Sequence, residues 1–175
     1  MRRVIVAAAL LALATPVALA IPAPAPFQPS FIAGNWKGTW HNLKFGSTGP
    51  AYIKAKAIGT GKTAKLNFRS DFGGNVFGCA DPAPETTTVT PGKGANHWNA
   101  LGFVVKVTSK ALGKLTLTYN NVKKTITGSG GNPPCNPGLT WTVTGKFVGK
   151  TFNGTVVIHL PDASTAISKI ALKKS

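Results

Sequence analysis

Acidic side chains are scarce in this sequence, which has 4 Asp and Glu residues against 20 Lys and Arg. Histidine is also rare, with 3 residues dispersed along the chain. General acid–base catalysis needs side chains that exchange protons, and metal sites need clustered ligands. This inventory argues against catalysis, so we expect a protein that is not an enzyme and that holds neither a metal nor a cofactor.

Long apolar stretches are missing after the first segment of the chain. The single candidate, from Val4 to about Ala14, is too short to span a bilayer comfortably. Arg2 and Arg3 precede it, and Ala18-Leu19-Ala20 follows with the A-x-A pattern that a signal peptidase reads. We therefore predict a signal peptide over residues 1–20 and a secreted or periplasmic protein with no integral membrane segment after cleavage. The alternative is an uncleaved membrane anchor, which no charged stop-transfer cluster supports.

Cysteine occurs only twice, at Cys79 and Cys135. Neither residue belongs to a C-x-x-C pair or has a histidine neighbour, which argues against a reactive or metal-binding pair of thiols. Two thiols in an exported chain favour a disulfide. Because each cysteine lies in a turn-rich segment, we expect the bridge to join two loops. In the chain-entropy model such a bridge stabilises the fold by about 4 kcal/mol.

Arginine is nearly absent once the predicted signal peptide is removed, because only Arg69 remains beside 17 lysines. The whole chain has a formal charge of +16, and such a charge attracts anionic partners. Scattered lysines nevertheless lack the planar fork with which arginine holds phosphates and bases. We expect a solvated basic surface, no nucleic-acid partner, and anionic envelope polymers as loose partners.

Helical periodicity is absent as well, because no capped stretch sustains apolar residues at i, i+3, i+4 and i+7. Period-two alternation runs from Ala33 onward, as in Leu115, Leu117 and Tyr119, and turns recur at the spacing typical of a sandwich or barrel. Strands are expected over residues 35–43, 51–58, 62–69, 86–90, 101–107, 115–119, 123–127, 139–147, 152–160 and 165–172, with a short apolar piece near residues 76–77.

These strands predict a single all-β domain over residues 33–175. A proline-rich, extended lead-in is expected over residues 21–32, since alternate prolines favour polyproline II. A sheet of eight to ten strands has two edge strands whose unpaired backbone groups could pair with another chain. Closing the sheet on itself removes both edges. We therefore predict an antiparallel up-and-down β-barrel. A two-sheet β-sandwich is the alternative, because the same alternation serves both folds.

The folded region opens with Gly34-Asn35-Trp36, and Trp36 and Trp40 share one face of the first strand. This opening resembles the G-x-W motif that begins the first strand in calycins, the superfamily of lipocalins and avidin-like barrels. There the tryptophan closes one end of the barrel and the open end admits a small ligand, so the resemblance implies a barrel-closing role for Trp36. Lipocalins also place a late arginine over this tryptophan. Here Lys169 or Lys173 is the candidate substitute.

A polar and aromatic cluster follows the flexible stretch at residues 90–94. It consists of Asn96, His97, Trp98 and Asn99. An aromatic face flanked by amides can stack on a sugar or another flat ligand, so these four are the candidate ligand-binding residues. The alternative is structural, with Trp98 plugging one end of the barrel while Asn96 and Asn99 form hydrogen bonds in turns.

These patterns predict an exported, non-enzymatic barrel that binds a small apolar or carbohydrate ligand. Space beside small inward residues such as Ala55, Ala57 and Gly145 would admit that ligand, whereas large side chains at the centre would exclude it. The first alternative is an exported inhibitor or adhesin that acts through its disulfide-tied loops. The second is a hydrolase that uses Asp71 or His97, suggested only by the loop positions of these two residues.

Overall fold

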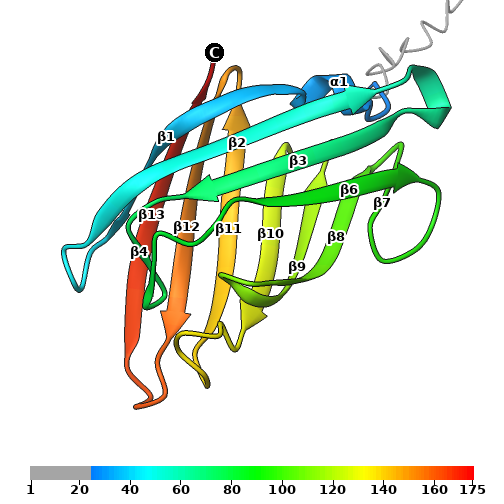
Figure 1. Cartoon of the computed structure of the whole chain (residues 1–175). Helices are drawn as coiled ribbons and strands as arrows, with labels where there is room; N and C mark the ends of the chain where they lie inside the picture. The colour runs from blue at the N-terminus through cyan, green and yellow to red at the C-terminus, as the bar shows by residue number, and fades with distance from the viewer. Residues whose placement is uncertain (1–24) are drawn as a thin grey trace, which may run out of the picture.

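A computed structural model describes residues 25–175 of the chain. In this part of the chain eleven strands form a closed barrel in the order β1-β13-β12-β11-β10-β9-β8-β7-β6-β3-β2, and β4 and β5 form a separate hairpin (Figure 1). The barrel strands are β1 (Gly34–Asn42), β2 (Thr48–Ile58), β3 (Lys65–Phe72), β6 (Glu85–Pro91), β7 (His97–Asn99), β8 (Gly102–Ser109), β9 (Gly113–Asn120), β10 (Thr125–Gly131), β11 (Thr140–Val148), β12 (Thr151–His159) and β13 (Thr165–Lys174). The other elements are α1 (Pro29–Ile32), the 3₁₀ turn η1 (Gly61–Thr63), β4 (Asn75–Val76) and β5 (Cys79–Ala80).

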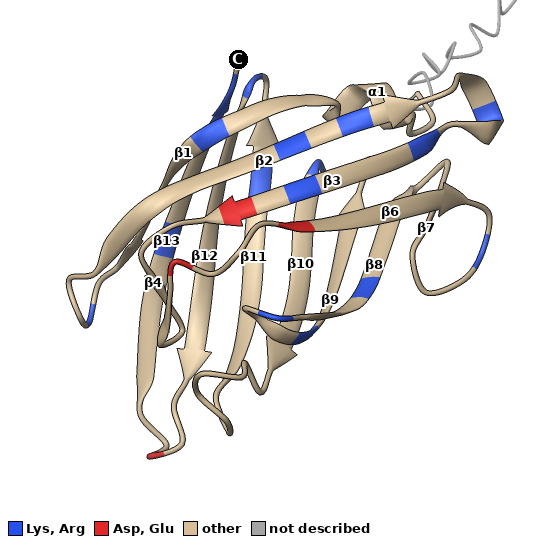
Figure 2. Cartoon of the chain, in the orientation of Figure 1, with Lys and Arg blue, Asp and Glu red and all other residues tan. Residues whose placement is uncertain are grey.

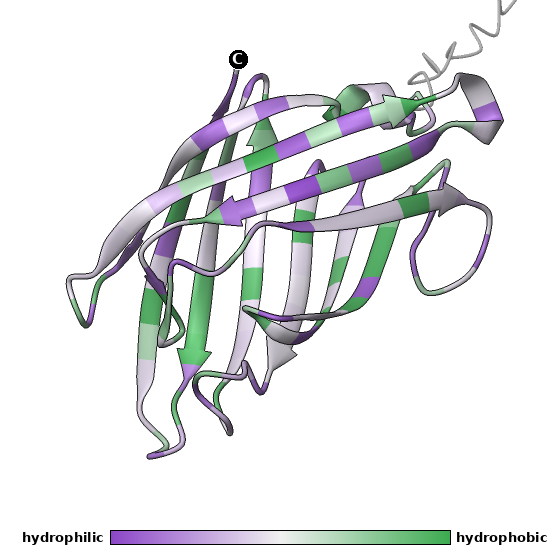
Figure 3. Cartoon of the chain, in the orientation of Figure 1, coloured by the Kyte–Doolittle hydropathy of each residue, from purple (hydrophilic) through white to green (hydrophobic). Residues whose placement is uncertain are grey.

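Side chains alternate between the inside and the outside of the barrel along each strand, as the pleat of a β-strand requires. In β1 the Trp36 and Trp40 side chains are buried, whereas Lys37 is exposed. Neighbouring strands keep this alternation in phase. Leu66 of β3, for example, lies opposite Val89 of β6, and both are buried. Figure 3 shows the resulting alternation of apolar and polar residues, which gives the sheet one apolar face.

The predicted all-β barrel is confirmed, with one strand more than the expected eight to ten. β1 pairs with β13 from Trp36 opposite Lys174 to Asn42 opposite Ser168. This pairing closes the sheet and removes its edges, which a two-sheet sandwich would have kept. Closure therefore decides between the two folds that the alternation alone left open.

The sequence does not predict β5 or β7, which have two and three residues. After a glycine-containing loop, β7 pairs in parallel with β6, through Thr90 opposite His97 and Pro91 opposite Trp98. The barrel therefore departs at this one place from a strictly antiparallel up-and-down order. Strands this short carry no visible alternation, because period two shows itself only over four residues or more.

The segment before β1 belongs to the packed core. Pro29–Ile32 form the short helix α1, and Phe27 is 0% exposed. The expected extended lead-in over residues 21–32 is thus wrong for its last part, because burial of one aromatic side chain contributes about 2–3 kcal/mol and docks the segment on the barrel. The predicted signal peptide at 1–20 and residues 21–24 lie outside the described residues. No helix between residues 25 and 175 is long and apolar enough to cross a membrane.

Candidate functional site

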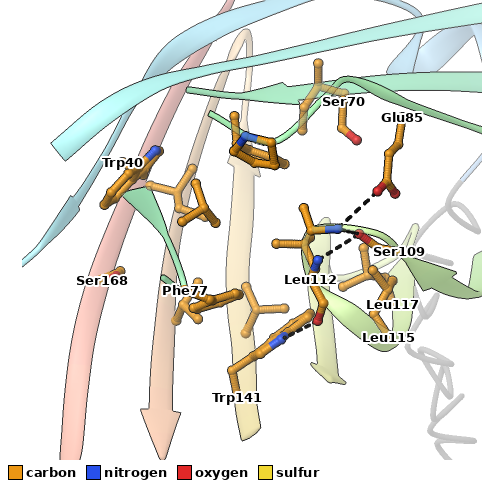
Figure 4. A pocket seen from close by; sticks show the side chains of 18 of the residues that line it. Trp40, Ser70, Phe77, Glu85, Ser109, Leu112, Leu115, Leu117, Trp141 and Ser168 are labelled. Atoms are coloured by element: carbon orange, nitrogen blue, oxygen red, sulfur yellow. Dashed lines mark hydrogen bonds between the residues drawn. The ribbon is translucent and has the colours of Figure 1, made fainter. Parts of the chain in front are cut away.

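The interior of the barrel contains a cavity of about 600 Å³. Its walls consist of inward-facing residues from every barrel strand except β7, and most of these residues are aliphatic or aromatic (Figure 4). Small-molecule sites in proteins typically have volumes of about 300–1,000 Å³, apolar walls and a few polar groups. The cavity is therefore the candidate functional site.

The space does not arise where the sequence suggests it. None of Ala55, Ala57 and Gly145 lines the cavity. The Phe152 ring occupies the place beside Gly145, where a Cβ atom would lie 2.4 Å from it. The cavity instead lies between medium-sized side chains, and the large residues Trp36, Phe103 and Trp141 line it without filling it. The medium-sized residues include Ile53, Val105, Leu117, Val143 and Ile170.

Aromatic side chains and α1 close one end of the cavity. Phe27 lies within 6.0 Å, between ring centroids, of Trp98, Phe103 and Tyr119. Burial in this cluster raises the pKa of the Tyr119 hydroxyl, because the phenolate would lose its hydration. This end is therefore a packed aromatic plug.

Trp36 lies at the same end, where a residue with a barrel-closing role would lie. Its Nε1 donates a hydrogen bond to the Ile32 carbonyl oxygen at 2.9 Å, which joins β1 to α1. The basic residue over the ring is Lys174, whose Nζ lies 5.6 Å from the ring centroid. The expectation of Lys169 or Lys173 there is wrong, because Lys174 is the residue in register with Trp36.

Residues 73–84 line the other end of the cavity; they connect β3 to β6 and contain the β4–β5 hairpin. We call this segment the cap. Phe77 of the cap lines the cavity, and the Gly73 carbonyl oxygen accepts a hydrogen bond from Trp40 Nε1 at 2.9 Å. A disulfide joins Cys79 to Cys135 in the β10–β11 loop. The predicted bridge is confirmed, although Cys79 lies in the short strand β5 rather than in a loop.

Glu85 is the only charged residue among the described residues that line the cavity. It lies opposite Ser70 of β3, and both side chains are on the inward face (Figure 4). Its Oε1 accepts hydrogen bonds from the backbone N–H groups of Lys110 at 2.6 Å and Ala111 at 3.2 Å. Ser109 Oγ accepts a second hydrogen bond from Ala111 at 3.1 Å. These groups form one polar corner of a cavity with mainly apolar walls, whose other polar side chains include Asn42, Asn136 and Ser168.

Basic residues are distributed over the outside of the barrel, notably along β1, β2 and β3 (Figure 2). Lys37 of β1 lies directly opposite Lys173 of β13, and Lys54 of β2 lies opposite Arg69 of β3. Like charges in these positions repel one another. The outer face of these strands is therefore a positive surface, whereas no Lys or Arg of the described chain lines the cavity.

The four sequence-predicted ligand residues lie outside the cavity walls. Trp98 is buried, and its Nε1 donates to the Ala64 carbonyl oxygen at 2.7 Å. Asn96 Oδ1 accepts from the Lys106 backbone N–H at 2.7 Å, and Asn99 Oδ1 accepts from that of Leu101 at 2.8 Å. The His97 ring bonds through Nδ1 to a neighbouring carbonyl oxygen. These contacts match the structural alternative, and ligand binding by these four residues stays a prediction.

The residues of the hydrolase alternative also lie apart from the cavity. Asp71 is on β3 between the inward-facing Ser70 and Phe72, and opposite Tyr52 of β2 on the outer face. His97 is in β7, the one barrel strand that contributes nothing to the cavity walls. Between residues 25 and 175, no three or more His, Cys, Asp and Glu side chains are grouped so that they could hold a metal ion.

Sequence reasoning missed Glu85 and Phe77. Glu85, Thr87 and Val89 are alternate residues of β6 and therefore share one face of the strand. Because Val89 is buried, this spacing indicated that Glu85 points inward as well. The expected strand began one residue later and excluded Glu85. Phe77 belongs to the apolar piece noted at residues 76–77, but it lies just after β4. Its place in the cavity wall had no signal in the sequence, because the disulfide ties this connection to the β10–β11 loop.

The fold is similar to that of a protein of unknown function from the DUF3598 family of Nostoc punctiforme PCC 73102. The TM-score is 0.52 at 12% sequence identity, and the match covers 93% of this chain and 53% of that one. The likeness is one of fold. This chain spans about half the length of that protein. No protein-family model and no curated protein matches the sequence.

Proposed function

We propose that the barrel is a non-enzymatic binding protein that holds a small apolar ligand in its central cavity. One observation carries this proposal, namely a space of about 600 Å³ inside the barrel with mainly aliphatic and aromatic walls. Burial of apolar surface contributes about 25 cal/mol per Å². An apolar molecule therefore gains free energy by leaving water for this cavity.

An apolar ligand is better supported than a carbohydrate. A sugar loses hydrogen bonds to water when it is buried, and each unsatisfied hydroxyl costs about 1–3 kcal/mol. The cavity walls are mainly apolar, and their polar side chains are dispersed. Ser70, Glu85 and Ser109 form one corner, whereas Asn42, Asn136 and Ser168 come from other elements. Trp98, which the sequence suggested as a stacking platform, is buried in the aromatic plug.

The binding test uses N-phenyl-1-naphthylamine, a neutral dye whose fluorescence rises in apolar surroundings. The wild-type protein is expected to bind about one dye molecule with micromolar affinity. Ser168→Phe places a ring in the cavity, because Ser168 lines it, and is expected to weaken dye binding by about tenfold or more. Ile167→Phe is the matched control, since Ile167 is the next residue of β13 and is 41% exposed.

Saturable dye binding that Ser168→Phe weakens and Ile167→Phe leaves unchanged supports the proposal. Equal loss in both variants, or dye binding that never saturates, contradicts it. Urea denaturation of each variant reports whether the barrel is still folded.

We also propose that the protein is exported, and that its barrel is of the calycin kind. Export is supported by the leader pattern at residues 1–20 and by the Cys79–Cys135 disulfide, which is typical of oxidising compartments. The calycin proposal rests on the G-x-W opening. Expression with the natural leader, followed by intact-mass measurement of the recovered protein, tests export. A mass that corresponds to a start at Ile21 is expected, and retention of residues 1–20 contradicts it.

The positive outer face supports a second candidate function, which is binding of an anionic envelope polymer. Repulsion between Lys54 and Arg69, which lie directly opposite each other, is relieved when an anionic chain lies across them. Lys54→Gln with Arg69→Gln is expected to lower the salt concentration that elutes the protein from immobilised dextran sulfate. Lys114→Gln with Lys123→Gln changes the net charge equally and is the control, because these exposed residues lie in and just after β9, which pairs with neither β2 nor β3. Equal effects of the two pairs contradict a specific surface.

A further inference from the structure

The charge of the cavity differs in sign from that of the molecule. The chain has a formal charge of +16, yet among the described residues the one charged side chain in the cavity walls is the carboxylate of Glu85. No Lys, Arg or His side chain of residues 25–175 lines the cavity with it. A carboxylate with no basic partner attracts a cation, and at the edge of an apolar cavity it does so more strongly than in open water, because the effective dielectric there is lower.

The register of the strands directs Glu85 into the cavity. Val89, Thr87 and Glu85 are alternate residues of β6 and lie opposite Leu66, Phe68 and Ser70 of β3. Since Leu66 and Val89 are both buried, the whole row faces inward. Glu85 is at the end of this row, half-buried beside the cap, where a polar group can keep contact with water.

The hydrogen bonds of Glu85 leave acceptor capacity for a ligand. The backbone N–H groups of Lys110 and Ala111 both donate to Oε1. The second carboxylate oxygen is therefore available, and the hydroxyl of Ser70 lies on the same inward face in the opposite position of β3. An ammonium group carries three N–H donors, so it can bond to both.

We propose that the ligand of the cavity is an amphiphile with an apolar chain and a positively charged amine head, and that Glu85 is the residue that selects this head. The proposal rests on ligand binding in the cavity. The chain lies between the aliphatic and aromatic walls, and the amine lies at the corner of β3 and β6. Charge-assisted hydrogen bonds to the carboxylate hold the amine there.

The lysines on the outer surface do not reverse this selection. They are in water, where salt screens a charge within about 8–10 Å. An anionic head in the cavity meets the Glu85 carboxylate directly and finds no basic side chain in the walls. Fatty acids are therefore expected to bind more weakly than amines of the same chain length.

The experiment measures displacement of N-phenyl-1-naphthylamine by decylamine, decanol and decanoate at neutral pH. These competitors have chains of equal length and differ in the head. Decylamine is expected to displace half of the dye at a concentration about tenfold lower than decanoate does, since a hydrogen bond to a charged group contributes about 1.5–3 kcal/mol. Decanol is expected to lie between them.

Two variants assign the selection to the polar corner. Glu85→Gln keeps the Oε1 acceptor for the β8–β9 turn but removes the charge, and it is expected to reduce the amine-to-carboxylate difference to about threefold or less. Ser70→Ala, which leaves that turn untouched, is expected to weaken decylamine binding about threefold and to leave decanoate unchanged. Asp71→Asn is the matched control, because Asp71 is the next residue of β3 and lies on the outer face.

The outcomes separate the two proposals. Dye binding without preference for the amine, or with a preference that Glu85→Gln and Ser70→Ala leave unchanged, overturns the amine head and leaves the apolar cavity function intact. An equal effect of Asp71→Asn also overturns it, since a general change of charge then suffices. Failure of the wild-type protein to bind the dye overturns the cavity function itself and the amine head with it.

Discussion

Phe77 of the cap stacks on Trp141 of β11, with 5.9 Å between the ring centroids and 19° between the ring planes. Trp141 Nε1 donates in turn to the Leu112 carbonyl oxygen at 3.3 Å (Figure 4). The pair thus connects the cap, the barrel wall and the turn that Glu85 holds. It lies where a ligand of the cavity would have to pass if it enters beside the cap.

Phe77→Ala is expected to lower the free energy of unfolding by about 1 kcal/mol, because it removes one aromatic pair. It is also expected to accelerate release of N-phenyl-1-naphthylamine several-fold, since the cap loses a contact with the wall. Urea denaturation and stopped-flow fluorescence measure the two effects. Val148→Ala, at a 63% exposed position at the far end of β11, is the control. Unchanged release from the Phe77 variant would mean that the ligand leaves by another route.

Removal of the disulfide is expected to destabilise the barrel. Replacing Cys79 and Cys135 by alanine releases a cross-link between residues 56 apart in sequence. In the chain-entropy model this costs up to about 4 kcal/mol, which corresponds to a Tm lower by about 10 °C. Calorimetry with and without reductant measures it. The reductant should lower the Tm of the wild type and leave that of the double variant unchanged. A double variant as stable as the wild type would contradict this.

Phe27→Ala is expected to cost about 3–5 kcal/mol of unfolding free energy, since it empties a fully buried position in the aromatic plug. Phe45→Ala makes the same truncation at a side chain that is 60% exposed, and it is expected to change stability by less than about 0.5 kcal/mol. Urea denaturation of both variants provides the comparison. Equal costs would show that the segment before β1 is not docked on the barrel in solution.

Alkaline destabilisation is expected from Tyr119, because burial raises the pKa of its hydroxyl in the folded state above the ordinary value of 10.0. The unfolded chain therefore loses this proton first as the pH rises. The stabilisation due to Tyr119 is fully present below pH 10.0 and declines above it. Tyr119→Phe retains the ring and removes the titration. Its stability relative to the wild type should thus rise between pH 9 and pH 11, and a constant difference would contradict the burial effect.

The all-β fold was predictable because the long strands alternate clearly, as Leu115, Leu117 and Tyr119 do in β9. Alternation reports which side chains share a face, and that information suffices to place Trp36, Trp40 and Trp141 inside the barrel. It does not report which strands are neighbours. Closure of the sheet was therefore expected from the general instability of exposed sheet edges. No residue pattern in the sequence indicated that β1 pairs with β13.

The site was less predictable, because its polar corner depends on contacts between distant segments. Glu85 bonds to the backbone of Lys110, 25 residues away in sequence. From sequence it looks like an ordinary polar residue before a strand. Trp98, in contrast, looked like a ligand-binding residue because it lies beside amide side chains. The structure shows that its Nε1 bonds to a backbone carbonyl oxygen within the fold. Local composition cannot show either partner.

Pairing between β1 and β13 also sets the order of events in folding. The first barrel strand has to wait for the last, because Trp36 and Lys174 are direct neighbours although almost the whole barrel sequence separates them. Contacts of such long range slow folding, since the chain loses loop entropy before it gains them. Until residues 165–174 have paired, β1 and β12 each present an unpaired edge on which another chain can add.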